Sequence, residues 1–290
     1  MSIGQTQSVA LLGLTGSVVE IEVDISDGIP MYSLLGLPDA ALQESRDRVR
    51  AAITNCNEIW PNRKVTVSMS PAWLPKSGSS FDLSIALSIL IANQVLPQDA
   101  LSETVVLGEL ALDGKIRSVR GVLPALIAAY KSGITRAIIP FANRDEAQLM
   151  PQMQILAFEN LRDVLRWMRT GVRPEAQELD LLSVTQDGDL DFADVAGQSK
   201  ARFAAEVAAT GGHHLLLVGP PGAGKTMIAS RIPTILPSLT LDQALEVTAV
   251  HSISGSFTQR SPMSRMAPIV SPHHTASRVA IVGGGSHVIK

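Results

Sequence analysis

Residues Gly219–Thr226 read Gly-Pro-Pro-Gly-Ala-Gly-Lys-Thr, which fits the pattern G-x-x-x-x-G-K-[ST] of a phosphate-binding loop. The apolar run His214–Val218 stands directly before the loop and predicts a short buried parallel strand. Met227–Arg231 follows the loop and predicts a helix. A strand, a glycine-rich turn and a helix in this order predict an α/β fold with a nucleotide site at the turn.

Each residue type in the loop has a chemical use. Glycine lets the backbone turn its N–H groups toward phosphate oxygens, and a helix N-terminus adds a favourable dipole. The Lys225 ammonium is expected to neutralise the β and γ phosphates, and the Thr226 hydroxyl to bind Mg²⁺. ATP and Mg²⁺ are therefore the expected ligands. The predicted nucleotide-binding residues are Gly219, Pro220, Pro221, Gly222, Ala223, Gly224, Lys225 and Thr226.

A hydrolase of this type also needs an apolar strand ending in an acidic residue, which holds Mg²⁺ and polarises the attacking water. The only acidic residues after Met227 are Asp242 and Glu246, and both lie in a stretch with helical spacing, Leu241–Thr248. No arginine finger or sensor can be assigned. We expect an ATPase domain cut short before its acidic strand, which binds nucleotide weakly, does not hydrolyse it and contains no catalytic residue of its own.

Composition limits the class of protein. A chain of 290 residues predicts about two domains, and 46% hydrophobic with 18% charged residues is enough for full-sized cores. The net charge of −3 argues against an overall basic coat for nucleic acid. The single cysteine, Cys56, excludes an internal disulfide and is typical of a reducing cytoplasm. The N-terminus has no signal-peptide pattern, and the apolar stretch 83–92 is too short to cross a membrane, so a cytoplasmic protein is expected.

Periodicity divides the chain into a first domain at 1–170, a linker at 171–190 rich in Gly, Pro and acidic residues, and a nucleotide-binding domain at 191–290. Asp-Gly at 113–114 predicts a hairpin between strands 104–108 and 115–119. Arg46, Arg48 and Arg50 are expected on a solvated helix face. The other expected strands are 19–25, 64–69, 136–140 and 154–158, and the expected helices are 42–53, an amphipathic 83–92, 123–132 and 160–169 with Asn160 as its N-cap.

Several further stretches resemble known families. Asp191–Gln198 resembles the segment ahead of the phosphate loop in AAA+ ATPases, which packs near the adenine ring. Four later segments resemble the magnesium-chelatase-like branch of these ATPases: Leu236–Thr240, Glu246–Gly255, Ser271–Ser277 and Gly283–Ser286. Together with the first domain, the whole chain resembles the YifB/ComM family. The resemblance implies a homo-hexameric AAA+ ATPase that uses ATP and Mg²⁺. ComM members are DNA helicases that drive branch migration during transformation, so DNA is the implied partner.

The first domain resembles the peptidase domain of Lon protease, an α+β fold of the ribosomal-protein-like β-α type. Pro75–Ser80 corresponds to the Lon nucleophile loop and puts Ser80 at the position of the catalytic serine. A serine needs a base to accept its proton, and Leu123 stands where Lon has its catalytic lysine. Lys76 and Lys115 are the remaining candidates for that base. Ser79 with Asp82 instead predicts a capping box for helix 83–92.

Three functions follow in order of preference. The first is a hexameric DNA helicase or branch-migration motor linked to DNA uptake and recombination. The alternative is an ATP-dependent peptidase or peptide-handling protein that uses the Lon-like domain, and the third is a magnesium-chelatase-type ATPase. Residues 227–290 carry a net charge of +3, including Arg260, Arg265 and Arg278, which suits either a DNA-lining loop or an ordinary solvated surface. The doublets His213-His214 and His273-His274 lack the spacing of a zinc site.

Overall fold

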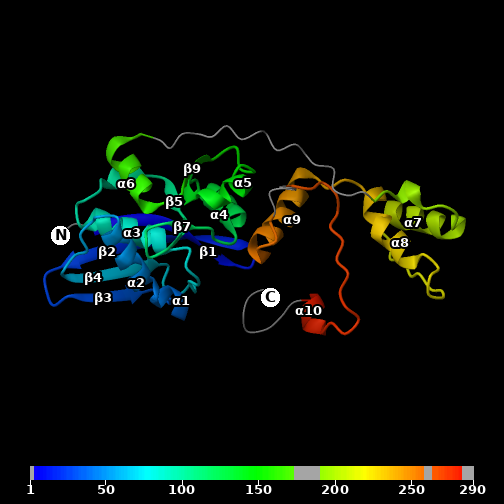
Figure 1. Ribbon diagram of the computed structural model, residues 1–290, viewed down its shortest axis with the longest axis horizontal. Coiled ribbons are helices and arrows are strands. Elements are labelled where there is room, and N and C mark those ends of the chain that lie inside the picture. Colours follow the sequence, from blue (N-terminus) through cyan, green and yellow to red (C-terminus); the bar gives the residue numbers. More distant parts are fainter. Residues whose placement is uncertain (1–2, 173–189, 258–262, 283–290) are drawn as a thin grey trace. The chain divides into compact units, whose positions relative to one another are not determined.

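The computed structural model describes residues 3–172, 190–257 and 263–282. The chain divides into two compact units (Figure 1). Unit 1 comprises residues 1–179 with 249–256, and unit 2 comprises 180–248 with 257–290. Most of the predicted linker 171–190, the Gly283–Ser286 motif and Arg260 lie outside the described residues.

Unit 1 is built on a seven-stranded sheet in the order β3-β4-β2-β1-β5-β8-β9. The pairs β1–β2 and β2–β4 are antiparallel and the other four are parallel, so the sheet is mixed and mostly parallel, consistent with the α/β class predicted for the chain as a whole. The strands are β1 (Ile3–Leu12), β2 (Thr15–Ser26), β3 (Met31–Leu35), β4 (Lys64–Ser70), β5 (Thr104–Val106), β8 (Arg136–Pro140) and β9 (Gln154–Phe158). The helices are α1 (Ala40–Gln43), α2 (Ser45–Asn55), α3 (Asp82–Ala92), α4 (Val122–Lys131), α5 (Arg144–Ala147) and α6 (Leu161–Thr170).

Helices cover both faces of this sheet. Side chains of β2 alternate between the two faces of the sheet. Val19, Ile21 and Val23 point to one face, where they pack in a core with side chains from α2, α3 and α6. The strand residues that point to the other face of the sheet, such as Val9 of β1 and Ile139 of β8, form a second core with side chains from α4 and α5. The predicted strands 19–25, 64–69, 136–140 and 154–158 are confirmed. Helix 160–169 is confirmed as α6, because the Asn160 side chain accepts a hydrogen bond from the backbone N–H of Asp163.

The predicted hairpin is only partly right. Its turn at Asp113-Gly114 is present, but the paired strands are the short β6 (Glu109–Leu110) and β7 (Ile116–Arg117). The preceding strand β5 pairs instead with β1 and β8 in the main sheet. Three buried residues, Thr104 to Val106, explain the difference, because a fully buried strand gains more from the centre of the sheet than from an exposed hairpin.

The prediction of an amphipathic helix at 83–92 is wrong. Every residue of α3 is buried, including the polar Asp82, Ser84 and Ser88. The buried hydroxyls donate hydrogen bonds to backbone carbonyl oxygens: Ser84 Oγ to Val106 O at 2.7 Å, and Ser88 Oγ to Ser84 O at 3.0 Å. Serine at these positions therefore marks internal hydrogen bonds rather than a solvent face.

The solvated helix face predicted for the three arginines of α2 is wrong for one of them. Arg48 reaches the fully buried Asp82 with two nitrogens, at 2.7 and 3.1 Å. The backbone N–H of Leu110 donates to the same carboxylate at 3.3 Å. Burial nevertheless dominates and raises the pKa of Asp82 to about 6, while Arg48 lowers it. Arg46 and Arg50 are exposed as predicted.

This carboxyl group makes the stability of unit 1 depend on pH. Its folded pKa of about 6 lies above the value of 3.8 expected in the unfolded chain, so the native state binds the proton more tightly. The contribution of Asp82 to the free energy of unfolding is fully present below pH ~4. As pH rises through 6, this contribution falls by about 2–3 kcal/mol. Urea unfolding followed by tryptophan fluorescence measures this, since Trp60, Trp73 and Trp167 all lie in unit 1.

The matched variant is Asp82→Asn, which cannot ionise. Between pH 4 and pH 7, the wild type should lose about 2–3 kcal/mol of unfolding free energy relative to this variant. Parallel pH profiles for the two proteins would contradict the assignment.

Unit 2 has a small core around α7 (Ser199–Gly211), the phosphate-loop helix α8 (Lys225–Arg231) and the 3₁₀ turn Phe192–Asp194. Its buried members are Phe192, Val195, Ala205 and Ile228. Helices α9 (Leu241–Ser254) and α10 (Arg278–Val282) follow, and residues 249–256, placed by sequence in the second domain, belong to unit 1. Among the described residues, no helix is both long enough and apolar enough to cross a bilayer.

Candidate functional site

The loop 219–226 is shaped by two glycines. Gly222 and Gly224 have φ values of +80° and +78°, the left-handed region that residues with a Cβ atom rarely adopt. Gly224 is the N-cap of α8, so the helix begins at Lys225, two residues before the predicted stretch Met227–Arg231. The two positive φ angles turn the chain abruptly into the helix, which is why this motif requires glycine there.

The ammonium of Lys225 lies against its own loop. Lys225 Nζ donates to Gly219 O at 2.8 Å and to Pro220 O at 2.7 Å. The Thr226 side chain, next along α8, is exposed. Gln198 Nε2 donates to Ala223 O at 3.0 Å, so the predicted adenine-side segment 191–198 contacts the loop directly. The loop thus brings a cation and a hydroxyl together beside a turn of main-chain donors.

The strand predicted at His214–Val218 is absent. Its side chains still alternate, since Leu215 and Leu217 pack on the small core while Leu216 and Val218 are about 85% and 84% exposed. A strand needs a hydrogen-bonded neighbour, and residues 190–257 and 263–282 contain no other strand. The apolar run predicted a buried strand, but a hydrogen-bonded ladder depends on a partner strand elsewhere in the sequence.

Among the described residues, acidic and histidine side chains form no metal site beside the loop. Asp242 and Glu246 lie on α9, as their spacing predicts. In the parts of the chain that are described, no three His, Cys, Asp or Glu side chains come together to hold a metal ion. The rings of His273 and His274 are 4.2 Å apart, because this doublet lies in a turn and not in a strand where neighbouring side chains point apart. Thr226 therefore remains the candidate Mg²⁺ ligand.

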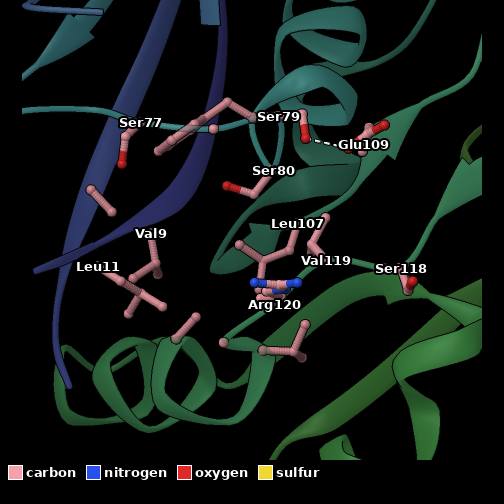
Figure 2. Close-up of a pocket in the computed structure, with 16 residues that line it drawn as sticks. Val9, Leu11, Ser77, Ser79, Ser80, Leu107, Glu109, Ser118, Val119 and Arg120 are labelled. Atoms are coloured by element: carbon pink, nitrogen blue, oxygen red, sulfur yellow. Dashed lines mark hydrogen bonds between the residues drawn. The ribbon is translucent and has the colours of Figure 1, made fainter. Parts of the chain in front are cut away.

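The second candidate site surrounds Ser80 in unit 1. Ser80 lines a pocket of about 400 Å³, and its hydroxyl has no hydrogen-bond partner among the described residues (Figure 2). The capping box predicted from Ser79 and Asp82 is wrong. The Ser79 hydroxyl donates to Glu109, Phe81 is the N-cap of α3, and Asp82 is paired with Arg48 as described above.

No described lysine is placed to accept the proton of Ser80. Lys76 is fully buried, and its Nζ donates to the backbone oxygens of Met69, at 3.0 Å, and of Pro71. Burial lowers the pKa of this ammonium, but its hydrogens are held by carbonyl groups. Lys115 is exposed and lies 3.6 Å from Asp113, and Leu123 is a buried aliphatic side chain. Neither candidate lysine therefore offers the Ser80 hydroxyl a free amine, and Leu123 has none.

A fluorophosphonate probe tests this reading of the serine. Because nothing activates the hydroxyl, the probe is expected to label the wild-type chain no faster than the matched Ser80→Ala variant. A serine peptidase run beside them shows that the probe is active. Labelling that maps to Ser80 would contradict the reading and favour the peptidase alternative.

Sequence reasoning missed residues of both sites. Gln198 ends the stretch 191–198 that resembles the AAA+ segment, but no sequence pattern predicts that its side chain contacts the loop. Glu109 and Arg120 line the Ser80 pocket from separate segments, and no motif links them to Ser80. Only folding brings these segments together.

The sequences of both units match known family models. Residues 21–143 match the family model described as subunit ChlI of Mg-chelatase, and residues 191–290 match the model described as magnesium chelatase, subunit ChlI. The first match covers much of unit 1, and the second contains the loop 219–226. Lon protease 1 of Myxococcus xanthus is 25% identical over 60% of the chain and 22% of its own length, a weak and partial likeness.

Whole-chain relatives extend the match. An uncharacterised protein of Mycobacterium tuberculosis (strain ATCC 25618 / H37Rv) is 49% identical over 99% of this chain and 57% of its own length. The uncharacterised protein YifB of Escherichia coli (strain K12) and the competence protein ComM of Haemophilus influenzae (strain ATCC 51907 / DSM 11121 / KW20 / Rd) are each 38% identical over 99% of the chain. The chain spans 56% and 57% of these two relatives. It belongs to the YifB/ComM family of magnesium-chelatase-like proteins.

Proposed function

We propose that this chain binds MgATP through the loop 219–226. The observation that carries the proposal is the placement of Lys225 at the first turn of α8 with its ammonium on the loop carbonyls of Gly219 and Pro220. Phosphate oxygens are stronger acceptors than neutral carbonyls, so the ammonium is expected to leave the carbonyls for the β and γ phosphates. Backbone N–H groups of the loop add further donors.

Mg²⁺ completes the proposed complex. Thr226 exposes its hydroxyl and makes no described hydrogen bond through it, so it is available as a metal ligand. Mg²⁺ is held by few protein ligands together with phosphate oxygens and water, which one hydroxyl satisfies. Magnesium-chelatase-like AAA+ proteins use nucleotide and Mg²⁺ in general, and this chain is proposed to do so at Thr226.

Titration with a fluorescent ATP analogue tests the binding. We expect saturable binding in Mg²⁺ that weakens when EDTA removes the metal, and competition by unlabelled ATP. AMP, which lacks the β and γ phosphates, should compete at least tenfold less well. Equal competition by AMP and ATP would contradict a site built around those phosphates.

We further propose that a protein of the relatives' full length containing these residues is a ring-forming, hexameric ATPase motor on DNA. The support is the family and the printed name of one relative, a competence protein. The test is ATP hydrolysis by such a full-length protein with and without forked or four-way-junction DNA. Hydrolysis stimulated by DNA is the expected result, and hydrolysis indifferent to DNA would favour a peptide or protein substrate instead.

A further inference from the structure

The pocket beside Ser80 lies where two parallel strands of the sheet diverge. β1 pairs with β5 at a single position, Gln7 with Val105, and both strands run on toward the pocket. In open α/β sheets, ligands bind in the crevice at the carboxyl ends of parallel strands. The pocket volume of about 400 Å³ is within the range of small-ligand sites. Its walls come from four separate segments, 9–11, 77–81, 107–109 and 118–125.

One wall of this pocket is an unpaired strand edge. β1 remains paired with β2 up to Leu12, opposite Thr15. On its other side, no strand of the described residues pairs with Val9–Leu12. Val9, Ala10 and Leu11 of this unpaired edge line the pocket. Such an edge can accept an extended peptide as an additional strand.

The polar lining carries one cation without a partner. Arg120 lines the pocket, is exposed and has no ion pair or hydrogen bond with any described residue. The other charge, Glu109, is engaged by the Ser79 hydroxyl and lies 3.5 Å from Arg117. Figure 2 shows Arg120 and Ser80 facing the same space. The site therefore favours an anionic group, and a planar carboxylate matches the guanidinium fork.

Apolar side chains share the remaining lining with Ser77, Ser79, Ser80 and Ser118. Leu11, Leu107 and Val119 offer a surface for an apolar side chain. Val122 and Ala125 of α4 also line the pocket, and Arg120 directly precedes Gly121, the N-cap of that helix. The terminal carboxylate of a strand added to β1 is such a planar anion, and it can pair with the Arg120 guanidinium through both of its oxygens.

We propose that this pocket binds the carboxyl-terminal end of an extended peptide, which pairs with the edge of β1 at Val9–Leu12 and places its terminal carboxylate on Arg120. The Ser80 hydroxyl donates to the same carboxylate, and no bond is made or broken. This binding site is separate from the nucleotide loop and does not depend on nucleotide binding.

A defined peptide pool tests the proposal on the full 290-residue chain. Randomised pentapeptides, half with a free carboxyl terminus and half amidated, are passed over the immobilised chain and the retained peptides are quantified by mass spectrometry. Free-carboxylate peptides should be enriched at least tenfold over amidated ones. Arg120→Gln should bring the ratio near one, whereas the matched control Arg50→Gln, an exposed arginine on α2, should leave it unchanged.

Backbone pairing is tested separately with a peptide selected from the pool. N-methylation at alternate residues removes its main-chain donors, and its affinity by fluorescence anisotropy should fall at least tenfold in one of the two alternations. No enrichment, equal retention of amidated peptides, or retention that follows Asp and Glu side chains would overturn the proposal. A ratio unaffected by Arg120→Gln would do the same, and so would N-methylation without effect.

Discussion

Replacing Lys225 with alanine is expected to weaken MgATP binding by about a hundredfold or more. The ammonium is the one positive charge of the loop, and charge-assisted hydrogen bonds to two phosphates contribute about 1.5–3 kcal/mol each. Loss of both corresponds to roughly two or more powers of ten in the dissociation constant. In the absence of nucleotide, Lys225 contacts only carbonyl groups of an exposed loop, so the fold should not depend on it.

The measurement is titration of a fluorescent ATP analogue, with the melting temperature as the control for folding. Lys200→Ala is the matched variant, because Lys200 is an exposed lysine of α7 in the same unit. It should bind as the wild type does. Unchanged affinity in Lys225→Ala, with an unchanged melting temperature, would remove the proposed nucleotide site.

The second large effect is expected for Gly4→Ala in β1. A Cβ atom at this position would lie 2.0 Å from the carbonyl oxygen of Ser88 and 2.6 Å from the backbone nitrogen of Ala92. Both atoms are main chain of α3, so no side-chain movement relieves the overlap. β1 and α3 would have to separate in a closely packed core, and we expect a loss of about 3 kcal/mol or more in the free energy of unfolding of unit 1.

Urea unfolding followed by tryptophan fluorescence reports this loss, because the three tryptophans lie in unit 1. The neighbouring variant Ile3→Ala is the control, since Ile3 is 57% exposed and its truncation should cost less than about 1 kcal/mol. Equal stability of Gly4→Ala and the wild type would show that strand and helix are not in the close contact described.

Several elements of unit 1 could be predicted because their signals are local. β2 alternates between the core and the surface over adjacent residues, and α6 carries both its apolar stripe and its N-cap Asn160 in one short segment. The predictions that were wrong concerned residues whose partners are distant. Arg48 finds Asp82 and Ser79 finds Glu109, 34 and 30 residues away in the chain. Periodicity carries no information about such pairs.

The sequence by itself predicted a phosphate-binding loop, since its glycines, Lys225 and Thr226 lie within eight consecutive residues and the shape of the loop depends on local backbone geometry. It also carried the family likeness. Only the tertiary structure decided which hydroxyls are engaged, that Lys76 is buried against carbonyl groups, and that Arg120 shares a pocket with Ser80 and the edge of β1. The physical reason is that a pocket and a buried ion pair are made by chain segments far apart in sequence, and their contacts exist only after the sheet has formed.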